Sequence, residues 1–244
     1  MWINADLGEG CAHDEELFKL VDWANIACGG HAGDEASMRK ACELALEHGV
    51  LPGAHPSYPD KAGFGRTKPN MDMAGLLDEL LRQMDWFENI AAKAGCTTAH
   101  FKPHGQLYND AAFDKSGAML LIEVAKRYPH LKLLALAGSP QVALSRGAGI
   151  VVVEEAFPDR AYLSSGALAP RTQPGAVLED PEQVKSQAAS IIRQGPLVCL
   201  DGSSHVVRAQ TLCVHGDSQQ ALANAKAVRQ ALIEHDQDTF GGAD

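Results

Sequence analysis

The chain has 244 residues, of which 45% are hydrophobic and 21% charged, and its formal net charge at pH 7 is −10. This composition is typical of a globular protein with a substantial core and excludes an intrinsically disordered chain. No run of Lys or Arg interrupts the acidic balance, which argues against a nucleic-acid partner.

The N-terminus and the cysteines predict a cytoplasmic protein. The opening residues, Met-Trp-Ile-Asn-Ala-Asp, lack the basic and apolar regions of a signal peptide, and no run of 18 apolar residues occurs. The six cysteines form no Cys-x-x-Cys pair, and several lie in apolar runs where they resemble small core residues. We therefore expect reduced thiols and neither a disulfide framework nor a membrane span.

A short apolar run, a polar or glycine-rich loop and a helical pattern recur along the first half of the chain. Strands are expected at 2–5, 24–28, 50–54 and 98–102. Helices are expected from Asp34, as N-cap, to Gly49, then over 73–95 and 110–128.

The same alternation continues in the second half. It predicts strands at 131–137, 150–155 and 211–214, and helices at 139–147 and from Asp180 to Gly195. Residues 197–207 suit a small hairpin or an irregular excursion. Asp217 is expected to cap a final helix that ends near 234, before a frayed tail over 236–244.

About seven strands, each followed by a helix, imply parallel pairing with right-handed crossovers. The sequence contains neither the Gly-x-Gly-x-x-Gly fingerprint of dinucleotide folds nor the Gly-x-x-x-x-Gly-Lys-[Ser/Thr] phosphate loop. We therefore expect one α/β domain over 1–244, a TIM-like barrel of about seven parallel strands, rather than an open doubly wound sheet.

Reactive side chains follow nearly every predicted strand, at the end where an α/β barrel gathers its function. Four of the ten histidines occupy this position on four different strands. The candidate catalytic residues are Asp6, Glu9, His31, His55, Lys102 and His104. The candidate substrate-binding residues are Asn4, Arg66, Asp159, Arg160 and His215.

Some of the strand-end residues have simpler explanations. Asp34 and Asp217 precede predicted helices, so N-capping explains each better than catalysis does. At least one of Glu154 and Glu155 is expected to be only a solvated strand end.

A cationic set lies on the same predicted face, and it suits a carboxylate or phosphate, although solvated surface charge is the alternative. Its members are Arg66, Lys102, Arg160 and Arg171. If the extended run continues through Pro103, Lys102 and His104 project to the same side, at a solvated barrel mouth.

The sequence does not decide whether the site binds a divalent metal ion. Converging imidazoles and carboxylates are the ligands that zinc or manganese takes in proteins. No pair has the tight spacing of His-Glu-x-x-His or His-x-His, however, so the sequence alone assigns no ligand set.

Taken in order, the motifs resemble those of the LamB/YcsF family over roughly residues 3–230. They are Asn-Ala-Asp-Leu-Gly-Glu-Gly at 4–10, Ala-Asn-Ile-Ala-Cys-Gly-Gly-His-Ala-Gly-Asp at 24–34, Gly-Ala-His-Pro-Ser-Tyr-Pro-Asp at 53–60, Gly-Phe-Gly-Arg at 63–66, Lys-Pro-His-Gly-Gln-Leu-Tyr-Asn at 102–109, Glu-Ala-Phe-Pro-Asp-Arg-Ala-Tyr at 155–162 and Val-His-Gly-Asp at 214–217. Gly30 departs from the pattern, because the family usually has phenylalanine there, and this change removes an apolar wall beside His31.

The resemblance implies a seven-stranded barrel related to sugar deacetylases. It also implies a role like that of component A of the prokaryotic 5-oxoprolinase, which works with components B and C to open 5-oxoproline to L-glutamate at the expense of ATP. Because the chain has no phosphate loop, we expect ATP to be bound mainly by, or together with, those partners. Two alternatives remain: a metal-dependent deacetylase or amidohydrolase that acts alone, and a non-catalytic substrate-binding subunit.

Overall fold

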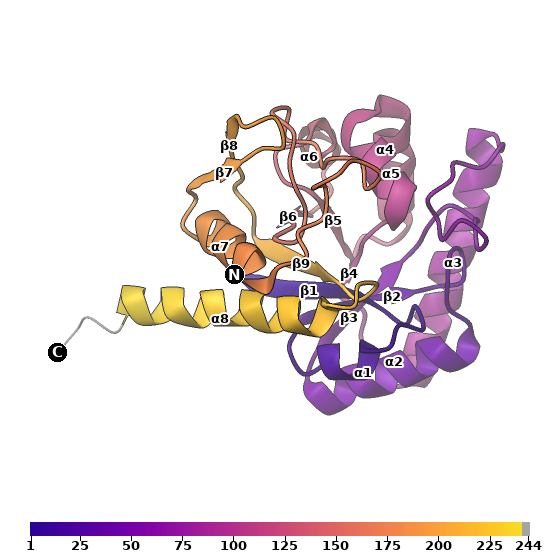
Figure 1. Cartoon of the computed structure of the whole chain (residues 1–244). Helices are drawn as coiled ribbons and strands as arrows, with labels where there is room; N and C mark the ends of the chain where they lie inside the picture. The colour runs from indigo at the N-terminus through magenta and orange to yellow at the C-terminus, as the bar shows by residue number, and fades with distance from the viewer. Residues whose placement is uncertain (241–244) are drawn as a thin grey trace.

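Seven parallel strands close into a barrel in the order β1-β2-β3-β4-β5-β6-β9, as the sequence predicts. A computed structural model describes residues 1–240, shown in Figure 1. The barrel strands are β1 (Trp2–Leu7), β2 (Trp23–Ala27), β3 (Leu51–His55), β4 (His100–Phe101), β5 (Lys132–Leu136), β6 (Val152–Ala156) and β9 (Thr211–His215).

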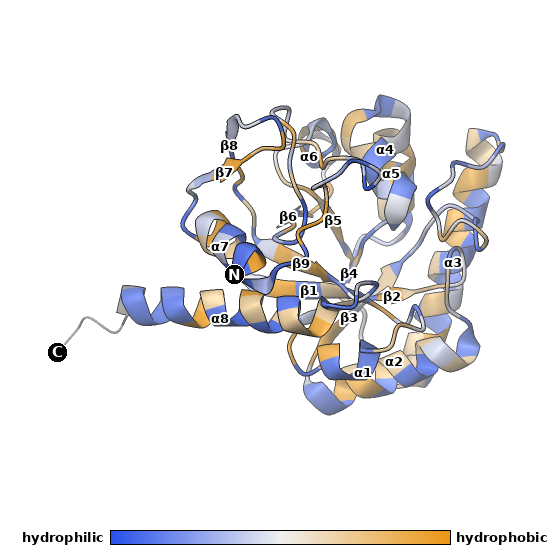
Figure 2. Cartoon of the chain, viewed as in Figure 1, coloured by the Kyte–Doolittle hydropathy of each residue, from blue (hydrophilic) through white to orange (hydrophobic). Residues whose placement is uncertain are grey.

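Helices surround the barrel and cover its outer face (Figure 1). They are α1 (Asp14–Leu17), α2 (Glu35–His48), α3 (Met73–Lys93), α4 (Gly105–Phe113), α5 (Lys115–Arg127), α6 (Pro140–Gly147), α7 (Pro181–Ile192) and α8 (Ala221–Phe240). Hydrophobic and hydrophilic residues alternate along these helices in Figure 2, as expected of helices with one face on a core. The predicted cap of α2 is confirmed: the Asp34 side chain accepts a hydrogen bond from the Ser37 amide.

Two helix predictions are wrong in detail. The helix expected over 110–128 is two helices, because Asp114 adopts an extended conformation and its carboxylate accepts hydrogen bonds from the amides of Ser116 and Gly117. Asp217 does not cap the final helix, which begins only at Ala221. That helix continues to Phe240, beyond the expected end near 234, and residues 241–244 of the predicted tail lie outside the described residues.

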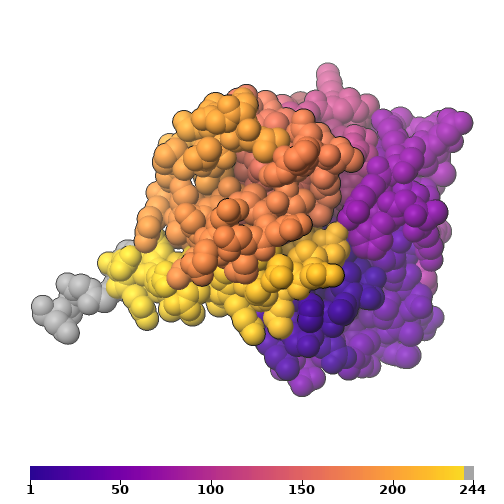
Figure 3. Space-filling view, in the orientation of Figure 1, coloured from indigo at the N-terminus to yellow at the C-terminus, as the bar shows by residue number. Residues whose placement is uncertain are grey.

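An excursion between β6 and β9 carries α7 and a two-stranded antiparallel sheet of β7 (Pro196–Val198) and β8 (Ser204–Val206). Of the two arrangements expected for residues 197–207, the hairpin is the one observed. Figure 3 shows this excursion in orange beside α8 in yellow, and α7 packs against α8. Among the helices of the described residues, none combines the length and the apolar character needed to cross a membrane.

The barrel interior is apolar at the bottom and polar toward the carboxyl ends of the strands. Trp23, Leu134 and Val153 form a buried apolar cluster inside it. Above it, His100 reaches past β3 and its Nε2 donates a hydrogen bond to Asn25 Oδ1 at 2.8 Å, and this close approach requires glycine at position 53. The polar layers continue into the site at the barrel mouth.

Candidate active site

One pocket opens at the carboxyl ends of the barrel strands, with an empty volume of about 530 Å³ that includes its open mouth. Residues predicted from the sequence line it: Asp6, Glu9, Arg66, Lys102, His104, Arg160 and His215. His31 and His55 lie directly behind this wall, bonded to Glu9 and His104 respectively. The convergence expected from the strand ends is therefore present in the structure.

Lys102 lies inside the barrel and not at the solvated mouth that the sequence suggested. Its side chain is 3% exposed, and Nζ lies 2.9 Å from Asp6 Oδ1 and 3.1 Å from Glu155 Oε1. Nζ is also 2.9 Å from the buried thiol of Cys213. Burial alone would lower the pKa of Lys102, but the neighbouring Asp6, Cys213 and Glu155 side chains raise it well above its usual value. Lys102 is thus a protonated ammonium group whose charge is balanced by neighbouring carboxylates.

Asp6 joins this lysine to the histidines. Its Oδ1 also accepts a hydrogen bond from Asn25 Nδ2 at 2.9 Å, and its Oδ2 lies 3.3 Å from His55 Nε2. Burial would raise the pKa of Asp6, but the neighbouring His55 ring and the Lys102 ammonium outweigh burial and hold that pKa well below the usual value. Asp6 is therefore an ionised carboxylate held between the Lys102 ammonium and the His55 ring.

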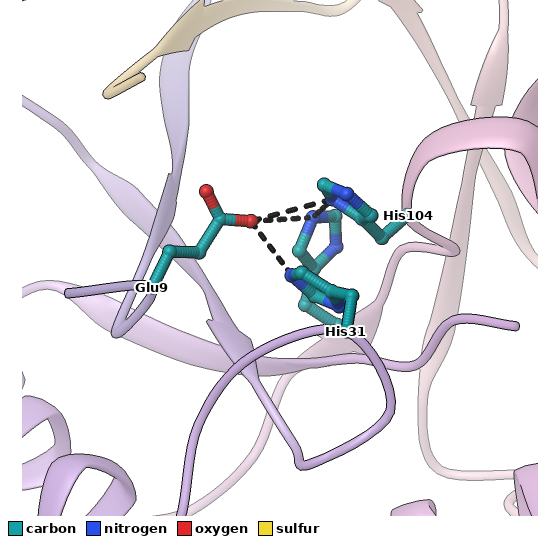
Figure 4. A group of neighbouring side chains, drawn as sticks. Glu9, His31 and His104 are labelled. Carbon is teal, nitrogen blue, oxygen red and sulfur yellow. Dashed lines mark hydrogen bonds and ion pairs between the residues drawn. The ribbon is translucent and has the colours of Figure 1, made fainter. Parts of the chain in front are cut away.

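Three histidines and one glutamate form a cluster beside Asp6, part of which Figure 4 shows. His31 and His104 stack in parallel with ring centroids 3.6 Å apart, and His55 meets both rings edge-on. Burial, reinforced by the Asp6 charge, raises the pKa of Glu9 to about 8. Burial, reinforced by His55, lowers the pKa of His31 to about 2, and burial, reinforced by the neighbouring His31, lowers the pKa of His104 well below its usual value.

The loop after β3 completes the cluster. The Phe64 carbonyl lies 3.1 Å from His104 Nε2, and Gly65, with φ +67°, lies so close to the His104 ring and to His31 Cβ that a side chain there would clash with them. Asp60 holds this loop closed by accepting hydrogen bonds from the amides of Gly63 and Thr67. Asp60 thus supports the loop rather than the pocket itself.

The rim of the pocket is cationic. Arg66 and Arg171 approach the same carboxylate oxygen of Asp217, at 2.7 and 3.6 Å. This pairing, and not helix capping, is what Asp217 does. The buried Arg160 guanidinium donates to the Ala169 and Ala176 carbonyls, and burial, together with the charge of Arg171, lowers its pKa to about 10.

Two predicted substrate-binding residues do not line this pocket. Asn4 is fully buried in a polar layer below Asp6, where it donates to Thr211 Oγ1 and accepts from Asn25 Nδ2. Its position therefore does not support contact with a substrate. Asp159 lies behind His215, with 2.7 Å between Oδ2 and Nδ1, and so acts on the pocket only by positioning that ring.

Several residues that line or support the site are not among the candidate catalytic or substrate-binding residues named from the sequence. Glu155 is fully buried beside Lys102, whereas Glu154 is partly exposed and pairs with Arg146, so one of the two glutamates is indeed a solvated strand end. Tyr108 and Phe157 form the apolar walls of the pocket, and Cys213 lies below Lys102. The alternation of faces along β6 and β9 was the available signal for Glu155 and Cys213.

Gly30 does not leave the open wall that its departure from the family pattern suggested. A Cβ atom at this position would overlap the Ser57 hydroxyl and the Gln83 amide. The Gln83 side chain is buried and bonds both the amide and the carbonyl of Ser57. The space beside His31 is therefore filled by glutamine.

Comparison with known proteins agrees with this fold and these motifs. The A subunit of a 5-oxoprolinase from Syntrophobacter fumaroxidans is 44% identical over 94% of this chain and 93% of its own length. The crystal structure of a lactam utilization protein from Thermus thermophilus is 39% identical, covers 96% of each chain and has a TM-score of 0.87. A family 4 carbohydrate esterase from Streptomyces lividans, at 12% identity over 96% of this chain and 88% of its own and with a TM-score of 0.50, shares only the fold. The sequence model of the LamB/YcsF family matches residues 1–241, and the chain belongs to that family.

Proposed function

We propose that this chain is the A component of a 5-oxoprolinase, which opens the lactam ring of 5-oxoproline to give L-glutamate in a reaction coupled to ATP hydrolysis. The relative from Syntrophobacter fumaroxidans carries that name, and the relative from Thermus thermophilus is a lactam utilization protein. The structural observation that carries the proposal is one pocket that combines a carboxylate–imidazole cluster with a cationic rim.

The chemistry of the reaction calls for both parts of this pocket. A five-membered lactam is a stable amide, and ATP drives its opening by phosphorylating the carbonyl oxygen. Water must then be activated to attack the carbon, the ring C–N bond breaks as the departing nitrogen receives a proton, and the phosphate leaves as inorganic phosphate. In this assignment the cluster of Glu9, His31, His55 and His104 is the end of the pocket where water is activated.

The rim supplies positive charge for the anionic groups. Arg66 and Arg171 share one carboxylate, Asp217, so their guanidinium groups retain donors for a substrate carboxylate or phosphate. Lys102 is less suited to that task, because Asp6 and Glu155 already neutralise it. We assign it instead the task of keeping Asp6 ionised beside His55.

Partner subunits, corresponding to components B and C, are proposed to bring ATP to this pocket. The chain contains no phosphate-loop sequence, and the relative from Syntrophobacter fumaroxidans is by name one subunit of a larger enzyme. The six cysteines are unpaired, which suits the reducing cytoplasm as the place where the complex works.

Glutamate release from 5-oxoproline tests the proposal, with the chain, its partner subunits and ATP supplied separately and together. Glutamate is expected only when all three are present. Turnover by the chain alone without ATP would instead support a self-sufficient amidohydrolase. Full turnover by a complex that contains His104→Gln would reduce the chain to a non-catalytic binding subunit.

A further inference from the structure

Four ligand atoms in the candidate active site converge on one point. Glu9 Oε1 lies 2.8 Å from His31 Nε2, 3.3 Å from His104 Nδ1 and 3.8 Å from His55 Nε2. His55 Nε2 and His104 Nδ1 are 2.9 Å apart, and all four atoms lie within 4.8 Å of one another. Four ligands about 2.0–2.1 Å from a tetrahedral zinc ion lie roughly 3.3 Å apart, so the observed spacing fits one such ion.

The outer hydrogen bonds of two histidines fix which nitrogens carry protons. His55 Nδ1 lies 2.7 Å from the Lys102 carbonyl, and His104 Nε2 lies 3.1 Å from the Phe64 carbonyl. A carbonyl oxygen only accepts, so both of these nitrogens donate. In the neutral rings, His55 Nε2 and His104 Nδ1 are then left with lone pairs that face each other. Histidines that bind metals are oriented in this way by their second nitrogen.

A single proton cannot provide a hydrogen bond for all four of the atoms that face one another in the cluster. A proton shared by His55 and His104 would still leave the inward atoms of His31 and Glu9 directed at the same point. One divalent cation at that point would instead accept an electron pair from each of the four residues. The cluster is also well enclosed, because His31, His55 and His104 are 3%, 0% and 7% exposed.

A neighbouring group of possible ligands is already occupied by a cation. Asp6, Cys213 and His215 also lie close enough to share an ion. The Lys102 ammonium, however, is 2.9 Å from both Asp6 Oδ1 and Cys213 Sγ. The ammonium already lies between that carboxylate and that thiol, which leaves the glutamate–histidine cluster as the better site.

We propose that Glu9, His31, His55 and His104 bind one divalent transition-metal ion of the zinc type. Three imidazole nitrogens and one carboxylate oxygen favour zinc over magnesium or calcium, which prefer oxygen ligands throughout. The ion would lie beside the pocket that Glu9 and His104 line. Four protein ligands fill a tetrahedral site, so the ion would act there as a fixed positive charge beside the end of the pocket where water is activated. That role rests on the proposed function, whereas the site itself rests on ligand geometry.

Metal titration of the whole chain tests this site without any substrate. The chain is stripped with a chelator and titrated with Zn²⁺ by calorimetry and with Co²⁺ by visible absorption. One ion of each is expected per chain, and the Co²⁺ spectrum should be that of a tetrahedral site. X-ray absorption of the zinc-loaded chain should show imidazole ligands at about 2.0–2.1 Å. Absence of saturable binding to the wild-type chain overturns the proposal.

Substitutions of single residues test which side chains bind the ion. Glu9→Gln and His104→Gln should each weaken Zn²⁺ affinity by more than about 100-fold, since even the loss of an outer-shell partner costs 10- to 100-fold. Cys213→Ser and the exposed His130→Gln are the matched controls and should bind as the wild type does. Circular dichroism confirms that each variant is folded. Unchanged affinity in folded Glu9→Gln and His104→Gln, or loss only in Cys213→Ser, contradicts the assignment. Because 5-oxoproline is not used, failure of this site is distinguishable from failure of the proposed reaction.

Discussion

Lys102 and Asp6 form an ion pair across the interior of the barrel, with 2.9 Å between Nζ and Oδ1. Asp6 belongs to β1 and Lys102 directly follows β4, and β2 and β3 separate these strands in the sheet, so the contact spans the lumen. Glu155 approaches the same ammonium from β6. The centre of the site is thus a buried charge network and not a solvated rim.

Lys102→Met should therefore lower the free energy of unfolding of the protein as well as the rate of turnover. Without the ammonium, Asp6 and Glu155 remain buried and uncompensated, and breaking a buried ion pair in this way costs about 3–5 kcal/mol. Urea unfolding measures the change in the free energy of unfolding. The exposed Lys126, which pairs with Glu123, provides the control: Lys126→Met should cost less than about 1 kcal/mol. Equal stability of the two variants would show that the buried network does not matter to folding.

Arg66→Met tests the anion-binding rim, and it rests on the proposed function. The Arg66 side chain is 48% exposed, so its loss should leave stability almost unchanged. Loss of a charge-assisted hydrogen bond should raise the KM of the complex for 5-oxoproline by about 10-fold or more, with kcat nearly constant. Arg82→Met is the control, because Arg82 is similarly exposed and bonds Glu79 away from the pocket. Steady-state kinetics in which both variants keep the wild-type KM would remove Arg66 from substrate binding.

Gly65→Ala should disturb the histidine cluster more than its backbone strain alone explains. Gly65 has φ +67°, and a Cβ there would lie 2.8 Å from His104 Cδ2 and 3.0 Å from His31 Cβ. Gly10 has φ +79° with nothing within 4 Å of the added atom, so Gly10→Ala is a matched control. Both substitutions incur about 1–2 kcal/mol of left-handed strain, and Gly65→Ala should add about 1–3 kcal/mol of overpacking. Chemical unfolding of the pair gives the difference, and a difference near zero would mean that the loop yields freely.

Asn4→Ala should reduce stability without changing substrate affinity, because Asn4 lies in the buried layer with Asn25 and Thr211. Loss of its hydrogen bonds should cost about 1–3 kcal/mol. Asn109 is the contrasting case, since it lines the pocket and its side-chain bond to the Gly105 carbonyl is exposed. Asn109→Ala should leave the free energy of unfolding within about 0.5 kcal/mol of the wild type. A raised KM in folded Asn4→Ala, measured in the complete complex, would return Asn4 to the substrate site.

Much of the fold could be predicted from local sequence patterns. Each barrel strand is a short apolar run, and each crossover helix carries its own start or stop signal, such as Asp34 at the start of α2 and Gly49 at its end. One exception was local and the other was not. Asp114 restarts a helix through two side-chain hydrogen bonds, and Asp217 is drawn away from the helix terminus by its ion pairs with arginines.

The grouping of the catalytic candidates was predictable for a topological reason. Parallel strands in a closed barrel bring their carboxyl ends to one face, so His31, His55 and His104 had to approach one another once the strands were recognised. The sequence by itself thus determined the family, the barrel and which residue types meet at its mouth.

Only the tertiary structure decided how deep each side chain lies and which atom it contacts. The depth of Lys102, the burial of Glu155 and the place of Asn4 below the pocket depend on contacts between distant strands. The sequence does not reveal whether a polar residue faces water or a buried partner. Its charge state and its role are set by desolvation and by neighbours within a few ångströms, and only the closed barrel supplies those neighbours.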